Sequence, residues 1–405
     1  MVFTPLRPPC GAYDAARCHE NDGTRSLYCR QNGWRPFKGL GPPSVSVIDK
    51  LAAHTIMQQV VMSNILLTQR PSHTAAGDFI YTRQLITMTS FWNELPRPFF
   101  ILAPMEAVTD VVFRHVVAAA APPDIYFTEF TNATGWAHAG DKAIGGRLIK
   151  TDDEHPIVAQ LWGADPASME KLAMHCAKLG YDGIDINMGC PDQSAVKSGG
   201  GSGMIKNPEN AAAIIAAAKK SGLPVSVKTR LGYSRLDEWP EWLGHLLRQD
   251  IANLTIHLRT KKEMSKVPAH FELIDAIKQL RDDIAPQTLL TINGDIKDRQ
   301  QGIELVEKHG IDGVMIGRGV FHNLFAFATS SDSSNKDIEL GLLNLQLNLH
   351  DKYNVQMPRK FDPLKRFFKI YIRDFPNAAE LRDTLMHTKN TDEVRDVLAN
   401  FTVDK

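Results

Sequence analysis

The chain has 405 residues, 43% of them apolar, which is enough for one large folded domain and additional segments. Lysine plus arginine and aspartate plus glutamate each number 46, so the net charge gives no indication of a polyanionic partner. The five cysteines are odd in number and irregularly spaced, which argues against a disulfide framework and is typical of a reducing cytoplasm.

Residues 1–90 are rich in Pro, Gly, Arg and Ser and lack a sustained hydrophobic period, which predicts a poorly structured N-terminal extension. The apolar stretch 47–67 contains charged and amide side chains, so it is too polar to span a membrane. The cysteines of the extension do not have the spacing of a zinc site, and we expect no metal. Met88 is an alternative start for the folded protein.

From residue 99 onward, short apolar runs alternate with stretches of helical periodicity. The predicted strands are 99–105, 124–130, 156–163, 182–189, 224–232, 252–260, 288–296 and 312–319. The helices predicted at 165–180 and 207–222 begin with Asp or Asn followed by Pro and end at Gly. Eight such units predict a (β/α)8 barrel over 91–328, because these barrels take about 250 residues. A doubly wound open sheet is the alternative, but no nucleotide-binding glycine pattern follows the first strand.

The C-terminal part of the chain has a different composition from the barrel region. The polar stretch 328–337 is predicted to be a linker, and 338–405 is predicted to be a small helical domain. Its expected helices are 340–353, 363–375, 377–388 and 391–401.

Each predicted strand ends in a polar or reactive residue, where barrel enzymes place their chemistry. The residues are Met105, Glu129, Gln160, Asn187 with Cys190, Lys228 with Arg230, His257 with Arg259, Asn293 with Asp295, and Arg318. Burying so many polar groups costs free energy unless they bind a ligand, so together they indicate a polar ligand site.

Glycine-rich turns follow the last two predicted strands, a position where barrels commonly hold a phosphate. We expect Gly294, Gly317 and Arg318 to bind that phosphate, and Lys228 and His257 to reach the polar ring edge of the same ligand. A flat phosphorylated cofactor such as FMN fits this set of residues.

The motifs APMEAVTD, TEF, AQLWG, DINMGCP, VKTRLG, IHLRT, NGDI and IGRG, taken together, resemble the dihydrouridine synthase family. These are flavin enzymes that reduce uridines in tRNA. The resemblance extends from about residue 99 to 325 and continues through FPNAAELRDTLMHTKNTDEV in the helical tail. NMGCP is the most specific of these motifs, whereas NGDI and IGRG also occur in other flavin barrels.

The resemblance implies that FMN is the cofactor, with NADPH as the electron donor, and that Cys190 donates a proton to uracil C5. Asn187 would orient the base, and Arg230 and Arg259 would lie on the substrate side. The implied FMN-binding residues are Pro104, Met105, Gln160, Lys228, His257, Asn293, Gly294, Asp295, Gly317 and Arg318. Three positions depart from the family pattern: Ala107 where an acidic residue is usual, Leu258 where glycine is common, and Phe271 where tryptophan is usual.

Two basic stretches are candidates for RNA contact. Lys365, Arg366 and Lys369 recur at helical spacing in the tail, as in a face that binds an RNA backbone, and a solvated helix surface is the alternative. The segment 261–272 matches the mobile active-site loop of the family and carries three further lysines.

We therefore expect a monomeric cytoplasmic tRNA-dihydrouridine synthase without membrane contact. An FMN barrel that acts on a free pyrimidine-like molecule is the main alternative. A catalytically inactive RNA-binding protein is a third, disfavoured because Cys190, Lys228 and His257 are all present. The sequence does not indicate which tRNA uridine is modified.

Overall fold

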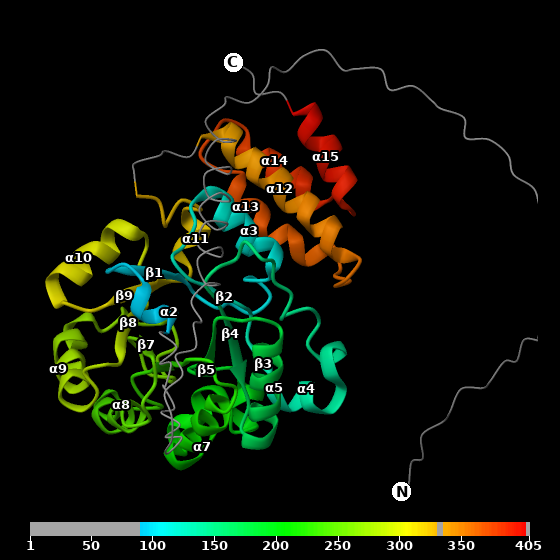
Figure 1. Ribbon diagram of the computed structural model, residues 1–405. Coiled ribbons are helices and arrows are strands. Elements are labelled where there is room, and N and C mark those ends of the chain that lie inside the picture. Colours follow the sequence, from blue (N-terminus) through cyan, green and yellow to red (C-terminus); the bar gives the residue numbers. More distant parts are fainter. Residues whose placement is uncertain (1–89, 330–334, 402–405) are drawn as a thin grey trace, which may run out of the picture. The chain divides into compact units, whose positions relative to one another are not determined.

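The computed structural model describes residues 90–329 and 335–401 (Figure 1). The extension predicted over 1–90, the alternative start at Met88 and the middle of the predicted linker lie outside the described residues, apart from Ser90.

The strands of the described region form one parallel sheet in the order β1-β9-β8-β7-β6-β5-β4-β2, with β3 paired to β4. A parallel bridge between Ile101 and Ile125 joins the first strand to the second and closes the sheet. The barrel prediction is therefore confirmed, and the open doubly wound sheet is wrong. The strands are β1 (Phe99–Leu102), β2 (Tyr126–Phe127), β3 (Thr131–Asn132), β4 (Ile157–Trp162), β5 (Gly183–Met188), β6 (Val225–Arg230), β7 (Asn253–His257), β8 (Leu289–Asn293) and β9 (Gly313–Ile316).

Helices follow the strands and surround the sheet (Figure 1). Asp165 and Asn207 accept hydrogen bonds from backbone N–H groups at the starts of α5 and α7, as their sequence signals predict. The helices of this region are α2 (Phe91–Glu94), α3 (Val111–Ala120), α4 (Ala133–Ala139), α5 (Pro166–Lys178), α6 (Gln193–Lys197), α7 (Pro208–Lys219), α8 (Trp239–Leu247), α9 (Ile274–Ile284), α10 (Arg299–His309) and α11 (Gly319–His322).

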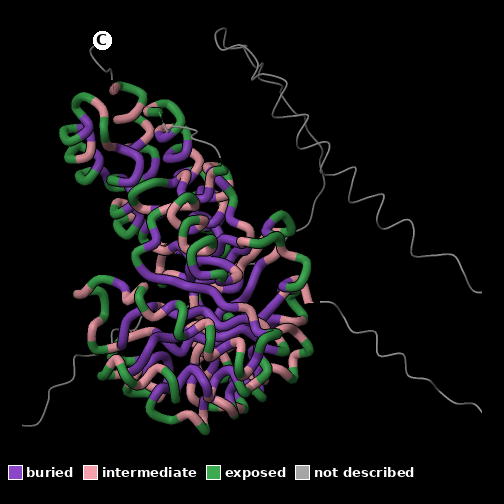
Figure 2. Tube along the Cα trace, turned by 90° about the vertical axis from the view of Figure 1, so that its left-hand side faces the viewer, coloured by how far each residue is buried: buried purple, intermediate pink, exposed green. Residues whose placement is uncertain are grey.

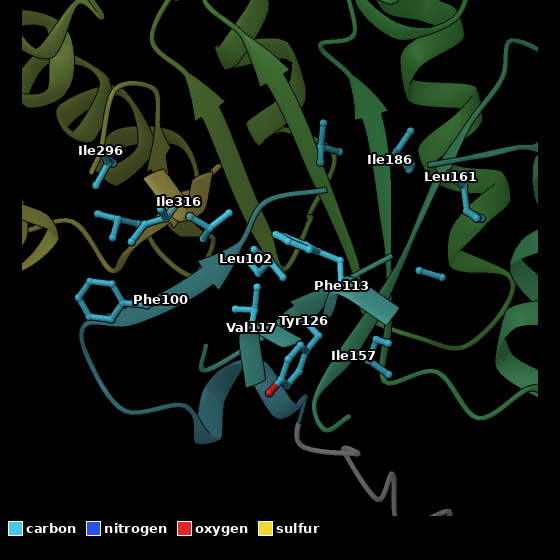
Figure 3. Packing of buried hydrophobic residues seen from close by; sticks show 14 of the residues in the cluster. Phe100, Leu102, Phe113, Val117, Tyr126, Ile157, Leu161, Ile186, Ile296 and Ile316 are labelled. Carbon is cyan, nitrogen blue, oxygen red and sulfur yellow. The ribbon is translucent and has the colours of Figure 1, made fainter. Parts of the chain in front are cut away.

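Alternation along β1 separates two apolar layers, because successive strand side chains point to opposite faces. Phe99 and Ile101 pack with Trp92 of α2 in one cluster. The neighbouring residues Phe100 and Leu102 belong to the larger cluster that joins the sheet to its helices (Figure 3). Buried segments accordingly run through the middle of the barrel, with exposed segments around them (Figure 2).

The interior of the barrel is polar on the side formed by β4 to β8. The register places Gln160 beside Asp185 and Asn187 beside Lys228. Nearer the carboxyl ends of these strands, Arg230 pairs in register with His257, which in turn pairs with Asn293. These strands therefore bring the polar residues predicted at their carboxyl ends to one rim.

The C-terminal region is helical, as predicted, and packs on the barrel. Tyr353 and Met357 from this region contact Val111 and Val112 of α3 in a small apolar cluster. The helix expected over 363–375 is broken into a 3-10 turn, Asp362–Phe367, and a short helix, α13. No described helix is long and apolar enough to cross a membrane. The helices are α12 (Lys336–Asn354), α13 (Phe368–Tyr371), α14 (Ala378–Met386) and α15 (Thr391–Asn400).

Candidate active site

A cavity of about 480 Å³ opens at the carboxyl ends of β1, β8 and β9, and we call it the β8–β9 cavity. Its volume lies within the range of roughly 300–1,000 Å³ that is usual for small-molecule sites. Nine of the ten residues predicted to bind a cofactor line this cavity, and Gln160 does not. The nine are Pro104, Met105, Lys228, His257, Asn293, Gly294, Asp295, Gly317 and Arg318.

Two buried nitrogen atoms beside this cavity lack a hydrogen-bond partner among the described residues, His257 Nδ1 and Arg259 Nη1. Both side chains flank Gly294, where a Cβ atom would lie 3.6 Å from His257 Cε1 and 3.7 Å from Arg259 Nη1. Buried polar groups are normally paired, so these two atoms are available to a polar ligand in the cavity.

Asp295 bonds to two arginine side chains at the β8–β9 cavity, Arg259 and Arg318. Its carboxylate pairs with Arg259 and accepts a hydrogen bond from Arg318 Nη2 at 3.0 Å. Although partial burial opposes ionisation, the hydrogen bond from Arg259 and the further bond from the Ala269 N–H lower the pKa of Asp295. Asp295 is therefore ionised at neutral pH, and Arg318 remains 58% exposed at the cavity mouth.

Burial and neighbouring cations lower the pKa values of two other lining residues, His257 and Lys228. Burial, with Arg230 and Lys228 nearby, lowers the pKa of His257 well below its usual 6.5, so its ring is neutral at pH 7. Burial and Arg230 lower the pKa of Lys228 to about 8. Lys228 Nζ donates to Asn293 Oδ1 at 3.1 Å, so the two predicted cofactor residues contact each other.

Cys190 lies just beyond the end of β5, on the wall of a separate cavity of about 390 Å³ that we call the Cys190 cavity. Its backbone N–H donates to Asn187 Oδ1 at 2.9 Å, and its carbonyl accepts from the Ser202 N–H at 2.9 Å. Burial raises the pKa of the Cys190 thiol, so the group keeps its proton at neutral pH. Other residues of this cavity include Glu106, Phe130, Asn132, Arg147 and Trp162.

Arg230, expected on the substrate side, directs its guanidinium at backbone carbonyls. It donates to Gly189 O at 2.8 Å, to Thr260 O at 3.1 Å and to Met264 O at 3.0 Å. Burial lowers the pKa of Arg230 to about 10, which leaves it charged at neutral pH. Arg230 thus ties the segment before Cys190 to the loop that follows β7.

Arg359, which precedes the 3-10 turn of the helical region, was not predicted from the sequence. Its guanidinium donates to Asp110 Oδ2 at 2.6 Å and to Glu129 Oε2 at 2.9 Å. Glu129 is fully buried, and its other oxygen accepts the N–H of Ala107 at 2.6 Å. Ala107, one of the departures from the family pattern, has a φ of 56°. We call Arg359, Asp110 and Glu129 the Arg359 clamp.

The lysine and arginine residues predicted to contact RNA differ in exposure. Arg366 and Lys369 are exposed, whereas the Lys365 side chain is only 14% exposed and pairs with Asp362 at 2.9 Å. In the loop after β7, Lys262 and Lys266 are exposed.

Within residues 90–329 and 335–401, no group of three or more His, Cys, Asp or Glu side chains is arranged to hold a metal ion. The fold and the site together define a (β/α)8 barrel whose ionisable and thiol groups converge at the carboxyl ends of its strands, the arrangement found in barrel enzymes.

Residues 101–404 match the family model described as dihydrouridine synthase (Dus). The chain is 59% identical over 314 residues to the probable tRNA-dihydrouridine synthase 2 of Bacillus subtilis, covering 77% of this chain and 96% of that protein. It is 58% identical over 314 residues to a probable tRNA-dihydrouridine synthase of Staphylococcus epidermidis, with the same coverage. The chain belongs to the dihydrouridine synthase family, as its motifs predict.

Proposed function

We propose that the protein is an FMN-dependent tRNA-dihydrouridine synthase, which reduces the C5=C6 bond of uridines in tRNA. The observation that carries the proposal is a protonated thiol, Cys190, placed at the same barrel rim as a cavity with unpaired polar groups. The names of the close relatives support the same activity.

The residues of the β8–β9 cavity fit FMN. Gly294, Gly317 and Arg318 would hold its phosphate, and Lys228 and His257 would face its ring. The unpaired His257 Nδ1 provides a polar atom for such a ligand. When bound and reduced, FMN supplies the hydride that uracil C6 receives, with NADPH as the proposed electron donor.

Cys190 supplies the proton in this proposal. As a hydride reaches C6, the thiol protonates C5, so that the C5=C6 double bond becomes a single bond and a thiolate remains. The thiolate then recovers a proton from solvent. Since burial raises the pKa of Cys190, the proton is in place at neutral pH before each cycle.

The tRNA would contact the exposed cations outside the cavities. Arg366 and Lys369 of the helical region, and Lys262 and Lys266 of the loop after β7, are exposed and suited to phosphate groups. Lys365 would contribute less, because it is largely buried against Asp362. The helical region 338–405 acts as the tRNA-binding domain of a monomeric cytoplasmic enzyme in this proposal.

The test separates the two half-reactions by stopped-flow absorbance. Wild type and Cys190→Ala are mixed with NADPH to follow flavin bleaching, and then with tRNA to follow flavin reoxidation. Cys176→Ala is the matched control, because Cys176 is the other cysteine in the described part of the chain and is fully buried in α5.

Cys190→Ala should bleach normally and lose about 10²–10⁴-fold in tRNA-dependent reoxidation, the usual contribution of a general acid. Cys176→Ala should match wild type in both steps. Reoxidation of Cys190→Ala at the wild-type rate would exclude this cysteine as the acid. Reoxidation by a free pyrimidine but not by tRNA would favour a small-molecule substrate.

A further inference from the structure

A carboxylate for which the sequence predicted no role, the first residue of the motif DINMGCP, lies beneath the candidate site. Asp185, in the middle of β5, is fully buried. Its Oδ2 accepts from Gln160 Nε2 at 2.7 Å, and its Oδ1 accepts from Ser226 Oγ at 2.6 Å. Lys228, whose charge acts on Asp185, donates its hydrogen bond to Asn293 instead. Among the described residues, the side chains that hydrogen-bond to Asp185 are therefore neutral.

The hydrogen bonds continue from Asp185 to the backbone of Cys190. Gln160 Oε1 accepts from Asn187 Nδ2 at 3.0 Å. Asn187 Oδ1 then accepts the N–H groups of Gly189 at 3.1 Å and Cys190 at 2.9 Å. Asp185, Gln160, Asn187 and Cys190 thus form one chain of contacts, which we call the Asp185 relay.

The relay has a fixed direction. An ionised carboxylate only accepts hydrogen bonds, so the Gln160 amide must turn its NH₂ group toward Asp185 and its oxygen toward Asn187. The Asn187 amide must then donate to Gln160, which leaves its oxygen for the two N–H groups. If the Gln160 amide rotated by half a turn, its NH₂ group would face the NH₂ group of Asn187. A matching rotation of Asn187 would relieve that contact, but Cys190 N–H would then lose its acceptor.

We propose that Asp185 is a positioning residue, which orients the Gln160 and Asn187 amides and so holds the backbone of Cys190 where its thiol can reach the substrate. This inference rests on the proposed role of Cys190 as the proton donor. Burying a carboxylate that forms no ion pair with the described residues is costly, which argues that the acceptor itself is needed.

Ser226 allows a test that separates the acceptor from the charge. In Asp185→Asn, the new amide can keep its oxygen toward Gln160 and give its NH₂ to the Ser226 hydroxyl, which also accepts hydrogen bonds. The direction of the relay is then preserved without a charge. Asp185→Leu has a similar shape but no acceptor. Ser226→Ala, which leaves Asp185 and its bond to Gln160 in place, is the control.

The experiment uses the full-length flavin-loaded protein. Flavin bleaching by NADPH and reoxidation by tRNA are followed for each variant, together with flavin content. A second readout is the rate at which iodoacetamide alkylates Cys190, determined by mass spectrometry of its peptide, with buried Cys176 as internal reference. Alkylation reports the placement of the thiol without requiring turnover.

Asp185→Asn and Ser226→Ala should reoxidise within about threefold of wild type, a change of less than 1 kcal/mol in the barrier. Asp185→Leu should lose about 10²-fold in reoxidation, the cost of displacing a catalytic group by about 1 Å, while bleaching stays near wild type. Its Cys190 should be alkylated faster than in wild type, because the N–H groups of the Cys190 segment are no longer held.

Equal reoxidation and alkylation rates in wild type and Asp185→Leu would overturn the inference. A hundredfold loss of the reoxidation rate in Asp185→Asn would also overturn it, because the charge of Asp185 would then matter and not the direction of the relay. The Asp185→Asn result decides the question even if Asp185→Leu does not fold. If Cys190→Ala reoxidises normally, the proposed acid is wrong, but the alkylation rates still report whether Asp185 positions that thiol.

Discussion

Replacing Gly201 with alanine should damage the site through a contact that can be measured in the structure. Gly201 has a φ of +52°, and a Cβ atom there would lie 2.7 Å from Cys190 O and 3.2 Å from Cys190 Cβ. Ordinary contact begins at 3.4 Å, so the Cys190 carbonyl must recede by about 0.7 Å. Because Cys190 O is already bonded to Ser202 N–H, the whole Cys190 segment should move.

The expected losses follow from two separate effects. Alanine in the left-handed region costs about 1–2 kcal/mol, which should lower the melting temperature. Displacement of a reacting group by about 1 Å can cost on the order of 10²-fold, so we expect tRNA-dependent flavin reoxidation to slow by about 10- to 100-fold. Flavin content and bleaching by NADPH should stay near wild type, because Gly201 does not line the β8–β9 cavity.

Gly310, which ends α10, is the matched control for this change. Its φ is +64° in the left-handed region, and a Cβ atom there would meet only the flexible Lys278 side chain, with Cε at 3.3 Å. Gly310→Ala should therefore show a similar loss of thermal stability from backbone strain and wild-type reoxidation. If tRNA-dependent flavin reoxidation ran at the same rate in both variants, the placement of Cys190 would not limit the reaction and the reasoning would be refuted.

Three further predictions concern other contacts of the site. Arg359→Ala should lower the free energy of unfolding by about 2–4 kcal/mol in denaturant titrations, because it leaves the buried Glu129 without its cation; an unchanged midpoint would contradict this. Arg318→Ala should weaken FMN binding by about 10- to 100-fold in a fluorescence titration, since a charge-assisted contact is lost, and undiminished affinity would place the phosphate elsewhere. Burial raises the pKa of Asp185 from 3.8 to about 6, so the stability that protonated Asp185 contributes is present below about pH 4 and is lost as the pH rises through 6. The reference is Asp185→Asn, in which Gln160, Ser226 and Lys228 are unchanged. Relative to this variant, the free energy of unfolding of wild type should fall by about 3 kcal/mol between about pH 4 and pH 7. A constant difference across that range would contradict the assignment.

The barrel was predictable because its signals are local. Strand runs, helix caps such as Asp165 and Asn207, and the glycines that end helices repeat along the chain at short range. The same regularity placed polar residues at the strand ends, and the structure brings six of the twelve predicted ones to the β8–β9 cavity. The second predicted strand, 124–130, is less regular and appears as the short strand β2, with β3 beyond its predicted end.

Features that depend on distant partners could not be predicted. Arg359 lies 249 residues from Asp110, and no spacing rule links them. Arg230 resembles a ligand-binding residue in the sequence, but its donors are directed at backbone carbonyls whose positions only the fold determines. Asp185 did leave a signal, because it is two residues from Asn187 on the same strand and must share its face.

The helical break at residues 362–371 has a similar origin. The hydrophobic period of 363–375 is compatible with one continuous helix, yet the chain forms a 3-10 turn and then the short helix α13. Leu364, Phe367 and Phe368 are buried in the core cluster shared with the barrel. Tertiary packing therefore overrides local preference here.

The Arg359 clamp sets a condition on exchanging parts between members of this family. Its cation comes from the helical region, whereas its two carboxylates come from the first and second loops of the barrel. A chimera joined at the predicted linker, 328–337, would transfer the cation without its carboxylates, and the recipient barrel would have to supply both. A crossover that preserves function must therefore match positions 110, 129 and 359 as a set, although they are far apart in the sequence.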